Sequence, residues 1–203
     1  ERLARLSPEQ RMQLVRQARL QKEESQNGQP DEKRAAHGRD TAIPPVSRTE
    51  RLPLSYAQQR LWFLAQLEGG EVYNVFGAVR LRGALDVKAL GRALQAIVQR
   101  HEILRTTYQT VDGSPWQIIA PARELPLPVV DLTGLPADAR AGQVEAHMAA
   151  ARSRPFDLSR DLMLRAQLLA LAEQEHLLRL TVHHIATDAL SNKLLMQELA
   201  TLY

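Results

Sequence analysis

Two adjacent histidines, His183 and His184, stand where a buried strand is expected to end and a helix to begin. The run before them, residues 177–182, is mostly apolar, and residues 190–203 have the apolar spacing of a helix. Successive side chains on a strand point to opposite faces, so the two histidines are predicted to lie in different environments. Asp188 stands at the expected start of the helix, where a carboxylate can cap free backbone N–H groups and interact favourably with the helix dipole.

Neither histidine identifies a function by itself. A single histidine at a strand end is usually a hydrogen-bonded structural residue, and a single aspartate at a helix start is usually only a cap. Two adjacent histidines followed by an aspartate four residues after the second form a more specific pattern. Because an imidazole can accept or donate a proton near neutral pH, this pair is the first candidate for a catalytic site.

The first quarter of the chain differs in composition from the rest. Ser7, Pro8 and Gln10 have the spacing of a helix start, and we interpret residues 1–24 as a helical linker or a docking segment. Residues 25–51 are rich in Gln, Glu, Lys, Arg, Gly and Pro and poor in large apolar residues, so they cannot bury enough surface to offset their ordering entropy. We expect them to form a flexible linker, and residues 22–51 to be the most mobile stretch of the chain.

The folded part is predicted to begin at Leu52 and to contain both strands and helices. Ser55 and Gln58 form a capping box at the start of a helix, Asp86 caps another helix with His101 on its buried side, and Asp112-Gly113 indicates a tight turn. The strands are expected at 74–82, 104–111, 115–120, 127–131, 162–172 and 176–183, and further helices at 137–152 and 190–203. The sequence therefore predicts an α/β fold in which residues 162–183 form an antiparallel hairpin that carries the histidines at its end.

Composition excludes or disfavours several classes of function. The net charge of +3 is dispersed along the chain, which disfavours nucleic-acid binding. There is no Cys, and the six histidines are scattered, so no metal site is predicted. No run approaches the roughly 18 apolar residues that a membrane span needs. We expect a cytoplasmic protein and, because the chain starts at Glu1 and stops within a helical pattern, an excerpt of a longer polypeptide.

Three motifs, in order, resemble those of nonribosomal peptide synthetase condensation domains. Residues 183–189 resemble the HHxxxDG signature of that family and of the wider chloramphenicol acetyltransferase-like superfamily. Residues 55–62 resemble the opening SxAQxRLW motif, residues 100–108 resemble RHExLRTxF, and the connector at 155–158 is also similar. Ala189 replaces the Gly of the signature, Leu190 replaces a common aromatic residue, and Tyr108 replaces Phe. The motif residues to which the resemblance assigns a structural role are Ser55, Gln58, Arg60, Trp62, Arg100, His101, Glu102 and Arg105.

The resemblance implies a fold and a reaction. It implies that residues 52–203 form the N-terminal lobe of a two-lobed, chloramphenicol acetyltransferase-like domain, with a mixed, mainly antiparallel sheet packed with helices. The substrates would be two thioesters on the phosphopantetheine arms of donor and acceptor carrier proteins, and the domain itself would bind no cofactor. The C-terminal lobe and an adjacent adenylation domain would be further partners. Both lobes would hold the substrates, so we predict that residues 1–203 alone are inactive.

The resemblance also assigns roles within the signature. His184 is the expected catalytic residue, as a base or as a group that positions the amine, whereas His183 and Asp188 would support it. Asp188 would fix the loop, together with a basic residue of the second lobe. Ala189 keeps the backbone N–H of the replaced Gly, but a positive φ at this position would be costly for Ala. Arg100, Glu102 and Arg105 are predicted to form a local charge network.

Two alternatives remain open. A related epimerase or a terminal acyltransferase shares the His-His-Asp signature. A non-catalytic module that docks carrier proteins is a hypothesis from a different class, and Ala189 gives it some support.

Overall fold

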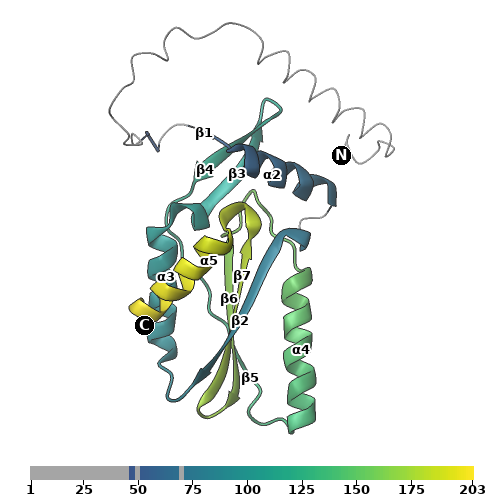
Figure 1. Ribbon diagram of the computed structural model, residues 1–203, viewed down its shortest axis with the longest axis vertical. Coiled ribbons are helices and arrows are strands. Elements are labelled where there is room, and N and C mark those ends of the chain that lie inside the picture. Colours follow the sequence, from purple (N-terminus) through teal and green to yellow (C-terminus); the bar gives the residue numbers. More distant parts are fainter. Residues whose placement is uncertain (1–45, 49–50, 69–70) are drawn as a thin grey trace, which may run out of the picture. The chain divides into compact units, whose positions relative to one another are not determined.

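The computed structural model describes residues 46–48, 51–68 and 71–203 (Figure 1). The chain divides into two units, Glu1–Ser47 and Arg48–Tyr203, and the second contains nearly all of the described residues. The helix expected within residues 1–24 and nearly all of the linker expected at 25–51 therefore lie outside the described residues. The fold below is that of Arg48–Tyr203.

The unit contains two sheets and four α-helices among the residues described. In chain order the elements are β1 (Leu52–Pro53), α2 (Tyr56–Glu68), η3 (Glu71–Tyr73), β2 (Asn74–Arg82), α3 (Val87–Arg100), η4 (Glu102–Arg105), β3 (Thr106–Val111), β4 (Ser114–Ile119), β5 (Val129–Asp131), α4 (Ala137–Ser153), β6 (Leu164–Ala172), β7 (Glu175–His183), η5 (His184–Ala186) and α5 (Ala189–Leu202). The smaller sheet has the order β1-β4-β3 and the larger β2-β7-β6-β5. Every pairing is antiparallel except β5 with β6, so the predicted mixed, mainly antiparallel fold is confirmed.

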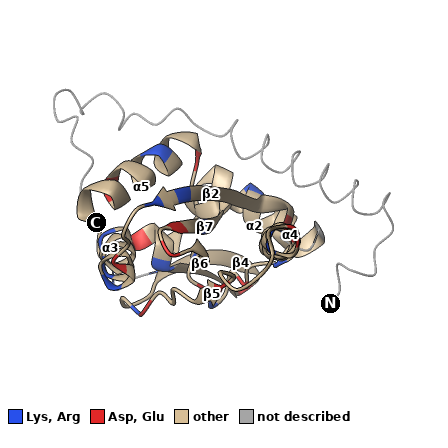
Figure 2. Ribbon diagram, turned by 90° about the horizontal axis from the view of Figure 1, so that it is seen from below, with Lys and Arg blue, Asp and Glu red and all other residues tan. Residues whose placement is uncertain are grey.

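Apolar side chains of β6 and β7 point alternately to the two faces of the larger sheet, and helices pack against both faces. One set of side chains, which includes Leu168, Leu178 and Leu180, packs with α3 and α5 in the main core. The other set packs a smaller cluster, which includes Leu169 and Leu177, against α4. Figures 1 and 2 show the same arrangement, with α3 and α5 on one side of β7 and α4 on the other. The end of β7 therefore lies between two packed layers.

The start of α2 is closed by the predicted capping box. The N–H of Ser55 donates to Oε1 of Gln58 at 2.9 Å, and the N–H of Gln58 donates to Oγ of Ser55 at 3.2 Å. The Gln58 amide also donates to Oε1 of Gln117 at 3.2 Å and to the hydroxyl of Tyr108 at 3.4 Å. Burial raises the pKa of the Tyr108 phenol, so this hydroxyl remains neutral. The first motif thus joins α2 to the smaller sheet.

The structure differs from the expected elements in the region after α3. His101, predicted on the buried side of the helix, is the C-cap residue of α3, and its side chain is 44% exposed. The chain then forms η4 before β3 begins at Thr106, two residues later than predicted. The short helix buries Leu104 and lets Arg105 donate to the carbonyl oxygen of Ala120 at 2.5 Å. Further on, the predicted turn is confirmed: Asp112 and Gly113 have φ of 52° and 77°, as a tight hairpin between β3 and β4 requires.

Candidate active site

His183 is the last residue of β7 and is fully buried. Its ring lies edge-on to Phe156, with 5.7 Å between the centroids, and 6.3 Å from the ring of Tyr73. Its Nδ1 accepts the backbone N–H of Ile185 at 3.1 Å, which caps the short helix η5. His183 therefore shapes the turn that follows the strand.

The environment of His183 keeps its ring neutral. Burial, together with smaller effects of the charges of His184 and Arg165, lowers the pKa of His183 to about 4. Because Nδ1 is an acceptor, the neutral ring carries its proton on Nε2, which is buried and has no partner among the described residues. A buried, neutral imidazole with one nitrogen already used is suited to structure rather than to proton transfer.

His184 has the opposite environment. It is the first residue of η5 and is exposed, although its neighbours on both sides are buried. Its carbonyl oxygen accepts the N–H of Thr187 at 3.4 Å, which ends the short helix. The prediction that the two histidines lie in different environments is confirmed. The imidazole of His184 is accessible to a substrate.

Asp188 caps α5, as the sequence predicts. Its Oδ1 accepts the backbone N–H of Ser191 at 2.8 Å and the Ser191 hydroxyl at 2.7 Å. These two bonds lower the pKa of the Asp188 carboxyl, and the charge of His184 has a smaller effect in the same direction. Asp188 has no basic partner within salt-bridge distance in the part of the chain that the structure describes.

Ala189 does not have the strained backbone that a positive φ would impose on it. It is the first residue of α5, and Asp112 alone among the described non-glycine residues has a positive φ. The expected cost of alanine at this position is therefore absent, because a helical φ suits alanine as well as glycine. Leu190, in place of an aromatic residue, and Leu194 on the next turn are both exposed.

The second motif along the chain, residues 100–108, forms two charge clusters rather than one network. Arg100 and His101 both pair with Glu198 of α5, with His101 Nε2 2.5 Å from Oε2. Glu102 instead pairs with Arg48 at 2.9 Å and with Arg105 at 3.7 Å. The prediction that joined Arg100 to Glu102 and Arg105 is therefore wrong.

Glu198 was missed by the sequence analysis. Its side chain is only 17% exposed, and its hydrogen bond with His101 is the largest cause that lowers the pKa of its carboxyl. A signal was present in the sequence, since Glu198 interrupts the apolar side of the helix between Leu195 and Leu199. The ion pairs join the end of α3 to α5 and so hold the helix that begins at Asp188.

The first motif along the chain, residues 55–62, lies beside the turn that contains His184, because α2 packs next to η5. Trp62 packs against the main core and Arg60 is exposed on α2. A cavity of about 150 Å³ lies beside η5 and is lined by residues that include His101, Thr187, Ser191 and Glu198, but not by His184. Among the described residues, no three His, Asp or Glu side chains are grouped to hold a metal ion, and no helix is long and apolar enough to cross a membrane.

Comparison with known sequences identifies the family. The family model of the Condensation domain matches residues 48–203. A protein of the linear gramicidin synthase from Brevibacillus parabrevis is 47% identical over 162 residues, which are 78% of this chain and 3% of that protein. The chain thus spans a few per cent of the length of such curated relatives.

Solved structures agree in fold. The first condensation domain of the calcium-dependent antibiotic synthetase, in complex with a substrate analogue, is 30% identical with a TM-score of 0.67, over 74% of this chain and 36% of that one. The X-domain from teicoplanin biosynthesis, in complex with OxyB, is 40% identical with a TM-score of 0.71, over 82% and 35% of the two chains. The chain therefore belongs to the condensation domain family of nonribosomal peptide synthetases.

Proposed function

We propose that this chain is part of a condensation domain that forms an amide bond between two carrier-bound thioesters. The donor is an acyl or peptidyl thioester, the acceptor is an aminoacyl thioester, and both are held on phosphopantetheine arms of carrier proteins. The observation that carries the proposal is the pairing of a buried His183 with an exposed His184 at the end of β7. The buried ring fixes the turn, and the exposed ring is left free to meet a substrate.

The chemistry requires one well-placed proton acceptor and no enzyme nucleophile. The acceptor amine attacks the carbonyl carbon of the donor thioester, the C–N bond forms and the C–S bond breaks. The thiolate of the donor arm leaves, and the amine nitrogen loses a proton. His184 accepts that proton or holds the amine in line for attack. Asp188 holds the start of α5 and pairs with a basic residue elsewhere in the complete domain.

The proposed partners and location follow from the same reaction. Donor and acceptor carrier proteins deliver the two arms, and an adjacent adenylation domain belongs to the same synthetase. The domain takes the arms as substrates and needs no cofactor of its own. We place the reaction in the cytoplasm.

The test replaces His184 in the complete condensation domain. We expect His184→Ala to lower the rate of dipeptidyl thioester formation by about 10²–10⁴-fold, as removal of a general base does. The product is measured by mass spectrometry after both loaded carrier proteins are supplied. His176→Ala removes a histidine from the start of the same strand and serves as the matched control. A folded His184→Ala protein that forms product at the parent rate would refute the assignment.

A second candidate function is docking without catalysis. It is favoured by the similarity to the X-domain, which was solved in complex with OxyB. The same assay, combined with a binding titration against the partner, separates the two functions, because a docking module forms no dipeptidyl thioester yet retains saturable binding to its partner. Inversion of a stereocentre without amide formation would instead indicate the related epimerase.

A further inference from the structure

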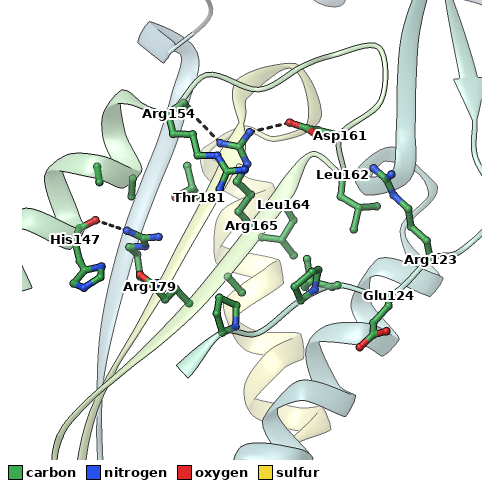
Figure 3. A pocket seen from close by; sticks show the side chains of 17 residues that line it. Arg123, Glu124, His147, Arg154, Asp161, Leu162, Leu164, Arg165, Arg179 and Thr181 are labelled. Atoms are coloured by element: carbon green, nitrogen blue, oxygen red, sulfur yellow. Dashed lines mark hydrogen bonds and ion pairs between the residues drawn. The ribbon is translucent and has the colours of Figure 1, made fainter. Parts of the chain in front are cut away.

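A cavity of about 490 Å³ opens on the α4 side of the larger sheet (Figure 3). It lies between β6, β7, the end of α4 and the loop that joins β4 to β5. Four arginines and two carboxylates line it: Arg123, Arg154, Arg165, Arg179, Glu124 and Asp161. No residue of the histidine signature lines it, and its volume falls within the range of about 300–1,000 Å³ found for small-molecule sites.

One of the four arginines is fully engaged by the fold. Arg165 donates to the carboxylate of Asp161 at 2.8 Å and to the carbonyl oxygens of Arg154 and Pro155 at 3.0 and 2.7 Å. Its guanidinium also lies 3.8 Å from the centre of the Phe156 ring. Figure 3 shows Arg165 turned toward Asp161 and Arg154. Asp161 therefore offsets part of the charge of Arg165.

The other three arginines have no such partner. Arg123 and Arg179 donate to the backbone carbonyl oxygens of Arg160 and His147, and no carboxylate lies within 4.0 Å of Arg123, Arg154 or Arg179 in the described ranges. Burial lowers the pKa of Arg179, and the charges of Arg154 and Arg165 lower it further. Arg154, Arg165 and Arg179 thus place positive charges in the cavity that repel one another.

We propose that this cavity binds a phosphate group, held by Arg123, Arg154 and Arg179. Planar guanidinium groups donate paired hydrogen bonds to oxyanions, and an anion beside Arg154 and Arg179 would relieve the repulsion between these two. The three arginines come from a loop, the end of a helix and a strand. A tetrahedral phosphate, with acceptor oxygens in several directions, suits donors from three elements better than a planar carboxylate does.

Calorimetric titration of the complete domain at low ionic strength tests the proposal. The probes are inorganic phosphate, dimethyl phosphate and acetate. Arg154 is exposed, so Arg154→Gln is not expected to impair folding, and we expect it to weaken phosphate binding by about tenfold or more. Arg179→Lys keeps the charge but loses the paired donors, and we expect its phosphate affinity to fall several fold. Arg152→Gln, on the same helix but outside the cavity lining, is the matched control and should change binding by less than about twofold.

Three results would overturn the phosphate site. They are the absence of saturable phosphate binding at about 10 mM, an equal loss of binding in Arg152→Gln, and binding of acetate as tight as that of phosphate. If dimethyl phosphate binds more tightly than inorganic phosphate, the site binds a phosphodiester. If inorganic phosphate binds more tightly, the site binds free phosphate. Both results uphold the site. No amide formation is measured, so failure here leaves the proposed function untouched.

Discussion

The end of β7 and its middle present two different kinds of polar region. At the end, Nδ1 of His183 accepts the N–H of Ile185 and Asp188 accepts the N–H of Ser191, although Nε2 of His183 has no partner among the described residues. In the middle, Arg179 faces a cavity where the charges of Arg154 and Arg165 repel it. The turn at residues 183–191 is therefore held largely by hydrogen bonds within it. The cavity instead carries positive charge that a bound anion would balance.

The largest stability effect within the loop should come from acid. In the unfolded chain His183 binds a proton below its ordinary pKa of 6.5, whereas in the folded protein it does so only near 4. The unfolded state thus binds more protons between these values, so stability falls as the pH drops from about 6.5 to 4, by about 3 kcal/mol for this group. Denaturant unfolding measured across this range checks the value.

The variant His183→Asn isolates that effect. The Asn Oδ1 can accept the N–H of Ile185 in place of Nδ1, but it does not titrate. We expect its unfolding free energy to lose about 3 kcal/mol less than the parent's over the same pH range. An unchanged pH dependence would show that His183 is not the responsible group, and would weaken the contrast between the two histidines.

A smaller effect should follow from loosening α5. Glu198→Gln removes the carboxylate that pairs with Arg100 and His101. We expect a loss of about 1 kcal/mol in unfolding free energy, because the pairs form a small network but are partly exposed. Glu145→Gln, which breaks an exposed pair with Arg152, is the control and should cost less than about 0.5 kcal/mol. Equal losses in the two variants would mean that Glu198 has no special role in holding the loop.

The smallest effect should be that of restoring the family's glycine. Because Ala189 already has a helical backbone, Ala189→Gly should lower stability by no more than about 1 kcal/mol. The rate of amide formation should stay within about threefold of the parent, since no strain is relieved. A rate increase of about tenfold or more would show that the Cβ of Ala189 obstructs the reacting groups.

Local features of the fold could be predicted from the sequence, because their determinants lie within a few residues. The Ser55–Gln58 box, the caps at Asp86 and Asp188 and the Asp112-Gly113 turn all formed as expected. The contrast between His183 and His184 was predictable for the same reason, although His184 begins a short helix rather than extending the strand.

Features that depend on tertiary packing could not be predicted. His101 was placed on the buried side of its helix because spacing alone cannot show that α3 ends there and turns toward Glu198, 97 residues later. The cavity arginines likewise come from segments separated along the chain, and no periodicity connects Arg123 with Arg179. The predicted single network of Arg100, Glu102 and Arg105 was wrong because Glu102 pairs with Arg48, which lies far before it in the chain.

The central claim is that His184 acts in the reaction while His183 supports the fold. The most direct measurement compares single-turnover amide formation by His184→Ala and His183→Asn in the complete domain at pH 7.5, with both proteins verified as folded. We predict a loss of about 10²–10⁴-fold for His184→Ala and less than about tenfold for His183→Asn. Equal losses in two folded proteins, or a larger loss for His183→Asn, would contradict the account.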